Sequence, residues 1–396
     1  MNANQIIEIE SRHTSGLYTK QPIIFVRGQG ASLFDIDGVE YLDCASGHGV
    51  ANLGHAHPKV AAALAEQSTK LITLFESFYN DQRAALMQKM GTLVPGLERV
   101  FFCNSGTESI EAAIKFARIS TGRPGIVATM RAFHGRTMGA LSATYNKKYR
   151  EGFEPLVPAY SHVAYNNIEA LEKAITSETA AFIVEAVQGE GGVYVAEAAY
   201  LQAARRICDE RGALLILDEV QSGFGRTGKW FAFQHSDIRP DLLCCAKSLA
   251  GGVPMGAVLI GAAVKNLVPG VHGSTFGGNP LSCAAAVAAL TAIEEEDLPK
   301  QATEKGAYLI QKLQQLNSPL VREVRGRGLM IGIELKQKVQ PYLKLLQERH
   351  ILGLNAGLTV IRLLPPLVIT YAQIDHLLEV LGEVLSNEAP ASSQAD

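Results

Sequence analysis

The sequence lacks the features that mark a disulfide framework, a zinc site or a nucleic-acid partner. Its six cysteines stand singly or side by side, with none of the C-x-x-C spacings that such frameworks and sites use. We expect them to be buried and to behave as small apolar residues. No run of Lys and Arg exceeds two or three residues and the formal net charge is −3, which argues against a nucleic-acid or membrane-surface patch.

Long apolar runs are missing as well. Residues 1–12 have no apolar core flanked by basic residues, so they do not resemble a secretory signal or a transit peptide. The most apolar stretch, 281–293, is shorter than the roughly 20 residues that a membrane-spanning helix needs. We therefore expect a cytoplasmic protein whose partners are small molecules or proteins.

The pattern that is present predicts an α/β fold. The 396 residues, 47% of them hydrophobic, can form one large core or two moderate ones. Asp37-Gly38 joins two alternating stretches and predicts a hairpin. Beyond Pro58, helical stretches such as 58–73 alternate with continuous apolar runs, which are typical of a mostly parallel sheet buried on both faces. These runs are 100–103, 181–184, 213–217 and 257–260.

The chain divides into four predicted parts. Residues 1–57 form an N-terminal segment with the hairpin, 58–279 a large domain, 280–386 a smaller α+β domain, and 387–396 a disordered tail rich in Ala, Ser and Pro. In the smaller domain we expect a helical block at 280–316, strands at 329–335 and 359–364, and helices at 339–348 and 371–385.

A strand, a polar turn and a helix follow one another from Val100. Ser105 and Thr107 lie in the turn, and the apolar positions from Ile110 to Ala117 recur with helical spacing. A helix N-terminus offers unpaired N–H groups and a partial positive charge, which suit a phosphate. An ordinary N-cap explains the same residues, and by itself it is the better explanation.

Two further residues follow buried strands. Asp218 ends the apolar run 213–217, and ligands of open α/β sheets bind at the carboxyl ends of strands, where a carboxylate can keep a pyridine nitrogen protonated. Lys247 follows the apolar run 242–246 and precedes Gly251 and Gly252. Loss of solvent there would lower its pKa and make it a candidate Schiff-base amine, although most lysines are solvated surface groups.

The order of these motifs, followed by Gly-Ser-Thr-Phe-Gly-Gly-Asn-Pro at 273–280, resembles the fold-type I pyridoxal-phosphate aminotransferases of subgroup III. The resemblance spans roughly 18–385. It implies a large domain with a mixed, mostly parallel sheet flanked by helices, a smaller C-terminal α+β domain, pyridoxal 5'-phosphate as cofactor and an obligate homodimer.

The resemblance also implies roles at the cofactor. Lys247 would carry the cofactor and move the proton, Asp218 would pair with the pyridine nitrogen, and Thr275 would reach the phosphate from the neighbouring subunit. The other implied contacts are Ser105, Gly106 and Thr107 at the phosphate, Phe133 and Val220 against the two ring faces, and Gln221 at the ring hydroxyl.

At the substrate, the resemblance implies a pair of arginines. Arg136 and Arg362 match the family's carboxylate-binding positions, and a planar guanidinium can bind a carboxylate bidentately. Glu190 matches a movable carboxylate that would neutralise Arg362 when the donor has no second carboxylate. Tyr18 and Ser274 would line the substrate entrance.

Within the subgroup, segments 14–30, 51–55 and 325–330 are most similar to acetylornithine aminotransferases and to lysine-pathway counterparts whose substrate is blocked by a small amino-group carrier protein. The implied reaction moves the ω-amino group of N-acetyl-L-ornithine, or of a blocked lysine analogue, to 2-oxoglutarate, giving a semialdehyde and L-glutamate in arginine or lysine biosynthesis. Ornithine and 4-aminobutyrate stay open as donors, and an aminomutase is a remote alternative.

Three other patterns are rejected. Residues 223–229 nearly spell the phosphate loop of nucleotide hydrolases, but Trp230 stands where that loop needs Ser or Thr. His55 and His57 lack a third metal ligand at a recognisable spacing, so we predict no metal site. Cys103 occupies the first glycine position of a hydrolase nucleophile elbow around Ser105.

Overall fold

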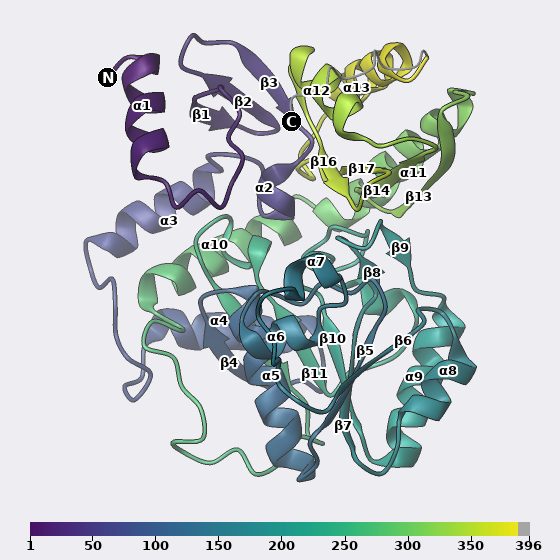
Figure 1. The fold of residues 1–396 in the computed structure, drawn as a ribbon. Coiled ribbons are helices and arrows are strands. Elements are labelled where there is room, and N and C mark those ends of the chain that lie inside the picture. Colours follow the sequence, from purple (N-terminus) through teal and green to yellow (C-terminus); the bar gives the residue numbers. More distant parts are fainter. Residues whose placement is uncertain (387–396) are drawn as a thin grey trace.

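The computed structural model describes residues 1–386 (Figure 1). The predicted disorder of 387–396 lies outside these described residues. A large lower part holds the main sheet between helices, and a smaller upper part combines the N-terminal segment with the C-terminal elements. The purple N-terminal strands lie beside the yellow-green C-terminal helices, although they are far apart in the sequence.

The main sheet has seven strands in the order β4-β12-β11-β10-β7-β5-β6. β12 is antiparallel to both of its neighbours, whereas the other pairs are parallel. The predicted mixed, mostly parallel sheet is therefore confirmed. The strands are β4 (Arg99–Cys103), β5 (Gly125–Thr129), β6 (Tyr160–Val163), β7 (Thr179–Glu185), β10 (Leu214–Asp218), β11 (Leu242–Cys245) and β12 (Gly256–Ile260).

Helices cover the sheet because each buries an apolar face against it. In α5 (Gly106–Thr121) the predicted apolar positions from Ile110 to Ala117 are all buried, and the helix packs on β11 and β12. It begins after Ser105, whose side chain caps it, and ends at Gly122 in the left-handed conformation. The other elements around the sheet are α6 (Met138–Ala143), α7 (Lys147–Arg150), α8 (Ile168–Ala174), β8 (Val187–Gln188), β9 (Tyr194–Val195), α9 (Ala198–Arg211), η1 (Ala232–His235) and η2 (Lys247–Ala250).

The smaller part contains two four-stranded sheets. The predicted hairpin is present as β2 (Ser32–Asp35) and β3 (Glu40–Asp43). A further strand, β1 (Phe25–Gln29), pairs antiparallel with β2. β15 (Ile351–Leu352) pairs in parallel with β3, so the N-terminal hairpin shares a sheet with the C-terminal part. The second sheet has β13 (Val321–Arg327), β14 (Met330–Leu335), β17 (Val360–Leu363) and β16 (Leu354–Ala356), flanked by α11 (Leu298–Gln315), α12 (Gln340–Glu348) and α13 (Tyr371–Val384).

Two helices early in the chain pack against a helix that comes much later in the sequence. α3 (Pro58–Ser68) begins with the predicted proline but ends before Thr73, so the predicted helix was too long. α10 (Pro280–Glu295) packs against α3 and against α4 (Asp81–Leu93). This helix begins at the predicted boundary between the large and small domains, and that boundary stays a prediction. The remaining helices are α1 (Ala3–His13) and α2 (Ser46–Gly49).

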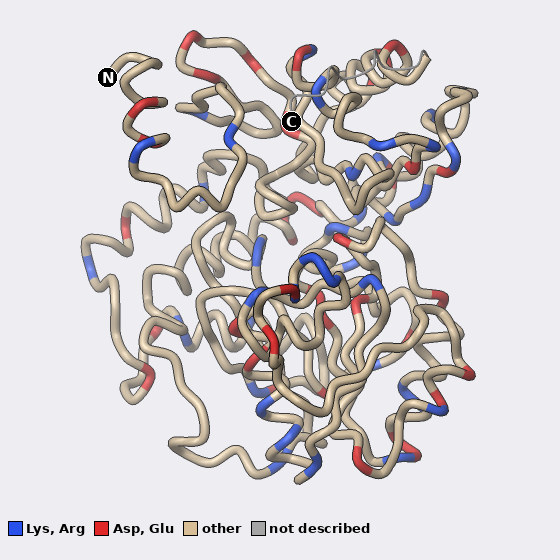
Figure 2. Tube along the Cα trace, viewed as in Figure 1, with Lys and Arg blue, Asp and Glu red and all other residues tan. Residues whose placement is uncertain are grey.

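Charged residues of both signs are distributed along the chain. Figure 2 shows Lys and Arg interspersed with Asp and Glu along the trace. All six cysteines are buried and unbridged, as predicted. Within residues 1–386, no helix is long and apolar enough to cross a membrane.

Candidate active site

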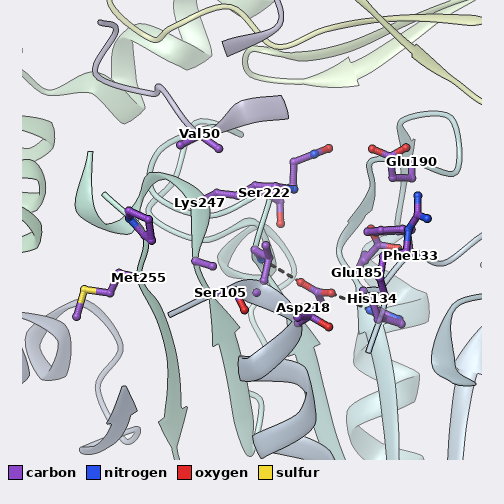
Figure 3. Close-up of a pocket in the computed structure, with 18 of the residues that line it drawn as sticks. Val50, Ser105, Phe133, His134, Glu185, Glu190, Asp218, Ser222, Lys247 and Met255 are labelled. Carbon is purple, nitrogen blue, oxygen red and sulfur yellow. Dashed lines mark hydrogen bonds and ion pairs between the residues drawn. The ribbon is translucent and has the colours of Figure 1, made fainter. Parts of the chain in front are cut away.

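A cavity of about 470 Å³ opens at the carboxyl ends of the central parallel strands (Figure 3). Most of the residues that the sequence proposed for the cofactor and substrate lie on its wall. They are Ser105, Gly106, Thr107, Phe133, Arg136, Glu190, Asp218, Val220, Gln221 and Lys247.

The sheet register explains why these residues meet. β10 ends at Asp218, which lies directly beside Glu185 at the end of β7. The neighbouring strand β11 ends at Cys245, so Lys247 follows at the same edge of the sheet. Because parallel strands point the same way, their carboxyl ends bring the three ionisable groups to one place.

Lys247 lies in a strained backbone conformation on the cavity wall. Its φ is +48°, in the left-handed region that side-chain-bearing residues rarely adopt. Burial and then the positive charge of Arg362 lower the pKa of Lys247 to about 8, although Asp218 and other carboxylates oppose the shift. Near neutral pH this amine is therefore uncharged far more often than an ordinary lysine, as a nucleophile must be.

Asp218 is held by His134, a residue that the sequence did not single out. The Nδ1 of His134 lies 2.7 Å from Oδ2 of Asp218, and the backbone N–H of Val220 donates to Oδ1 at 3.0 Å. Burial of His134 disfavours its charged form, but the hydrogen bond and charge of Asp218 outweigh this and raise the pKa of His134. The pair fixes the orientation of the carboxylate at the cavity floor.

Glu185 is the second residue that sequence reasoning missed. Burial raises the pKa of Glu185 to about 7. The charge of His134 opposes this shift, and the negative charge of Asp218 adds to it. Its carboxylate accepts from the N–H groups of Phe133 and Gly189, both at 3.3 Å. A usable signal existed, because Glu185 directly follows the apolar run 181–184 just as Asp218 follows 213–217.

The turn before α5 is shaped for an anion. The Oγ of Ser105 caps the helix at the N–H of Glu108, and the first-turn N–H groups of a helix have no partners within it. A Cβ on Gly106 would lie 2.8 Å from Cγ1 of Val220, so only glycine lets the backbone pass this close. The helix N-terminus thus reaches the cavity with N–H groups suited to a phosphate.

Arg362 is fully buried and bonded to two of the predicted residues. Its Nη2 lies 2.6 Å from Oε1 of Glu190, and its Nη1 donates to Oε1 of Gln221 at 3.1 Å. The Nε has no hydrogen-bond partner among the described residues. Gln221 in turn donates to the carbonyl oxygen of His48 at 3.1 Å. Glu190 therefore neutralises Arg362 in this structure.

The other predicted substrate residues, and Thr275 at the phosphate, have different surroundings. The guanidinium of Arg136 lies 4.0 Å from the centre of the Tyr149 ring and is exposed. Tyr18 is 77% exposed and does not line the cavity. Ser274 and Thr275 line a separate hollow, where Oγ of Ser274 accepts from Nδ2 of Asn104 at 3.2 Å. The roles given to Tyr18, Ser274 and Thr275 stay predictions.

The rejected motifs have other environments. The loop 223–230 leads into the short 3₁₀ turn η1 and not into the long helix of a nucleotide-binding loop. His55 lies 2.7 Å from Oδ2 of Asp43, and His57 lies 3.0 Å from Oε1 of Glu296, so the two histidines face different carboxylates.

Comparison with known proteins identifies the family. The family described as Aminotransferase class-III matches residues 15–385. This chain belongs to that family. The [LysW]-aminoadipate semialdehyde transaminase of Deinococcus radiodurans is 49% identical over 394 residues, covering 98% of this chain and 92% of that protein. An acetylornithine aminotransferase of Methanosarcina acetivorans is 45% identical over 381 residues and covers 96% of each.

A solved structure supports the cofactor. The ornithine aminotransferase from Toxoplasma gondii, described with partial occupancy of PLP at its active site, is 34% identical with a TM-score of 0.93, covering 97% of this chain and 94% of that one. This aminotransferase is therefore a fold-type I, pyridoxal-phosphate-dependent enzyme.

Proposed function

We propose that this aminotransferase moves the ω-amino group of N-acetyl-L-ornithine, or of a lysine analogue with a blocked α-amine, to 2-oxoglutarate, producing the semialdehyde and L-glutamate. The 2.6 Å pair of Arg362 and Glu190 carries the proposal, because a buried arginine with a partly exposed carboxylate can serve both a dicarboxylate and a donor without a second carboxylate. The names of the two relatives compared above support the choice of donor.

The residues at the cavity floor fit pyridoxal phosphate. Asp218 would hold the pyridine nitrogen, Phe133 and Val220 would bound the ring, and Ser105 with the following turn would hold the phosphate. When bound, the cofactor supplies an electron sink for the charge left when a C–H proton is removed. Gly106 and Thr107 at the phosphate and Gln221 at the ring hydroxyl complete the proposed contacts.

Lys247 and Asp218 would share the chemical work. The lowered pKa of Lys247 makes its uncharged Nζ available to bind the cofactor's carbonyl and, once released, to take a proton from the substrate carbon and return one to the cofactor side. Asp218, fixed by His134 at 2.7 Å, would face the ring nitrogen. Lys247 would therefore move the proton, and Asp218 would support the ring that takes up the charge.

The two arginines would read different carboxylates. Arg136 at the cavity wall would bind the α-carboxylate of the donor while Glu190 covers Arg362. Glutamate or 2-oxoglutarate would displace Glu190 and bind Arg362 with its second carboxylate. One site can then accept both substrates in turn, as transamination requires.

A homodimer is part of the proposal. Leu71, Ile72, Phe75, Phe78 and Tyr79 form a strongly exposed apolar stretch before α4, and such patches mark protein interfaces. Arg83 ties this stretch to the loop at Gly278, next to Ser274 and Thr275. We infer that a second copy covers this face and that the partner subunit's Thr275 reaches the phosphate, with Tyr18 and Ser274 at the shared entrance.

The cellular location, the pathway and the carrier protein are also part of the proposal. We place the enzyme in the cytoplasm, in arginine or lysine biosynthesis. A small amino-group carrier protein is the proposed blocking group in the lysine route, because the Deinococcus radiodurans relative is named for a LysW-linked substrate. Ornithine is the second candidate donor, since the solved relative with TM-score 0.93 is an ornithine aminotransferase.

A donor panel tests the proposal. Purified protein is mixed with 2-oxoglutarate and N-acetylornithine, ornithine, N-acetyllysine, lysine or 4-aminobutyrate, and glutamate formation is followed with the absorbance of the bound cofactor. We expect the α-blocked donors to have the highest kcat/KM. A higher kcat/KM for free ornithine or 4-aminobutyrate would refute the proposed donor.

A further inference from the structure

The loop 223–230, which resembles a phosphate loop, contains a fully buried arginine that contacts three separate segments. Nη1 of Arg226 donates to the carbonyl oxygen of Leu329 at 2.9 Å and to that of Pro365, and Nη2 donates to Oδ1 of Asn52 at 2.6 Å. Leu329 lies between β13 and β14, Pro365 follows β17, and Asn52 belongs to the N-terminal segment. One side chain therefore ties the loop after β10 to three distant parts of the chain.

Backbone contacts reinforce this junction. The N–H of Leu329 donates to the carbonyl oxygen of Arg226 at 3.0 Å. Nδ2 of Asn52 donates to the carbonyl oxygen of Phe224 at 2.9 Å, and the N–H of Leu367 donates to the carbonyl oxygen of Asn52 at 2.8 Å. Arg226 and Asn52 thus form a connected polar cluster inside the protein, in which only Nε of Arg226 lacks a hydrogen-bond partner among the described side-chain atoms of the two residues.

The cluster carries a charge without a direct counterion. Within residues 1–386, no carboxylate lies within ion-pair distance of Arg226. Burial lowers its pKa to about 9, although the charge of Asp43 opposes the shift. An apolar residue would avoid the cost of burying this cation. What the guanidinium adds is a planar set of donors that reaches three carbonyl or amide oxygens at once.

One of these three segments also carries the substrate-binding arginine. Arg362 lies in β17, three residues before Pro365. On the other side, Arg226 lies eight residues after Asp218 (226 − 218), in the segment that follows β10. Arg226 thus connects the segment after β10, which carries Asp218, to the segment after β17, which carries Arg362.

We propose that Arg226 is a positioning residue for Arg362, and that it sets where the second carboxylate of the dicarboxylate substrate binds relative to Lys247. The proposal rests on the proposed role of Arg362. Loss of the Arg226 contacts would let the segment after β17 shift, and a displacement of about 1 Å can cost up to about 10²-fold in rate.

Arg226→Lys tests this, because lysine keeps the charge but cannot reach all three oxygens. The half-reactions are measured separately. We expect the KM for 2-oxoglutarate to rise about tenfold or more, the KM for the best donor of the panel to change less than about twofold, and the absorbance of the bound cofactor to be unchanged. A merely structural role would lower the thermal midpoint and change both KM values together or neither.

Arg123→Lys is the matched control. Nη1 of the half-buried Arg123 also donates to three carbonyl oxygens, those of Thr179 at 3.3 Å, Arg211 at 2.8 Å and Gly212 at 3.1 Å, and none of them belongs to the Arg362 segment or to the proposed site. We expect this variant to lose some thermal stability while the ratio of the two KM values stays at the wild-type level.

Two further variants separate the possible outcomes. Arg362→Lys tests the proposed function by itself, since an unchanged KM for 2-oxoglutarate would refute the role of Arg362 whatever Arg226 does. If Arg226→Lys does not fold, Asn52→Ala removes one of the three contacts and should raise the same KM by a smaller factor. The positioning role would be overturned if Arg362→Lys raises the KM for 2-oxoglutarate but a folded Arg226 or Asn52 variant keeps the wild-type ratio of acceptor KM to donor KM.

Discussion

At the scale of single residues, the site depends on how charges share one buried space. Glu190 and Arg362 neutralise one another at 2.6 Å, while the charge of Arg362 helps to lower the pKa of Lys247. Carboxylates at the ends of β7 and β10 act in the opposite direction on Lys247. Substrate choice and amine reactivity are therefore coupled through Arg362.

Glu190→Ala should shift selectivity toward dicarboxylates. With its partner removed, Arg362 would attract glutamate and short diacids without having to release a carboxylate first. We expect kcat/KM for glutamate relative to N-acetylornithine to rise about tenfold, a size typical of one charge-assisted pair. Glu190→Gln keeps the shape and a weaker hydrogen bond, so its shift should be smaller. An unchanged substrate profile in Glu190→Ala would refute the switch.

The reactivity of Lys247 should depend on pH in a defined direction. Its pKa of about 8 lies below the ordinary lysine value of 10.5, so the uncharged fraction rises with pH and levels off above 8. We expect the rate at which cofactor-free protein binds pyridoxal phosphate to follow that curve in stopped-flow absorbance. Arg362→Met removes a nearby positive charge and should move the midpoint upward. A midpoint at the ordinary lysine value in the wild type would contradict the lowered pKa.

How well single residues could be predicted depended on the signal that each one carried. Asp218 ends an apolar strand and Lys247 follows one, and this position predicts their place at the cavity; Glu185 carries the same signal at the end of β7. His134 gave no such signal, because its role arises from a contact with Asp218, 84 residues away in the sequence. The role of Arg226 depends on contacts with Asn52, Leu329 and Pro365, which the local pattern at 223–230 does not indicate.

At the scale of elements, the strand–turn–helix formed by β4 and α5 was predictable because its apolar spacing and its capping residue are local. The strand order was not predictable in the same way. β12 is as apolar as its neighbours but runs antiparallel to them, and β15 joins the N-terminal hairpin through only two residues. Pairings between distant segments leave little trace in local composition.

Gly106→Ala tests the turn. The new Cβ would lie 2.8 Å from Cγ1 of Val220, so Val220 or the helix N-terminus must move. We expect the affinity for pyridoxal phosphate to fall at least about tenfold, as measured by equilibrium dialysis, because the phosphate site and one ring face are both displaced.

Gly91→Ala is the matched control within a helix. Gly91 lies in α4, and its Cβ would meet nothing within 4 Å. This change should raise the free energy of unfolding by about 0.5–1 kcal/mol and leave cofactor affinity unchanged. Equal cofactor affinity in Gly106→Ala and the wild type would contradict the steric role of the turn.

At the scale of the whole molecule, the continuous apolar runs predict the mostly parallel sheet, and the family resemblance predicts that the sheet is mixed; both predictions are confirmed. The division into domains stays a prediction. The sequence alone did not show that the N-terminal hairpin shares a sheet with β15, because their contact joins Leu42 to Ile351 across most of the chain.

Subunit mixing tests the shared site. If the partner subunit's Thr275 completes each site, Lys247→Ala and Thr275→Ala chains should restore one intact site in every mixed dimer, or about a quarter of all sites at random mixing. We expect activity at limiting cofactor to exceed the sum of the separate variants after co-refolding. No recovery, with mixed dimers shown by native mass spectrometry, would contradict the shared phosphate site.

The identity of the cofactor-bearing lysine is tested most directly by chemical trapping. Holoenzyme is reduced with borohydride, digested and mapped by mass spectrometry. Because Lys247 combines a cavity position with a pKa of about 8, we predict the reduced cofactor on Lys247 alone, and neither label nor transamination in Lys247→Ala. Label on another lysine, or full activity in Lys247→Ala, would contradict the assignment of the active site.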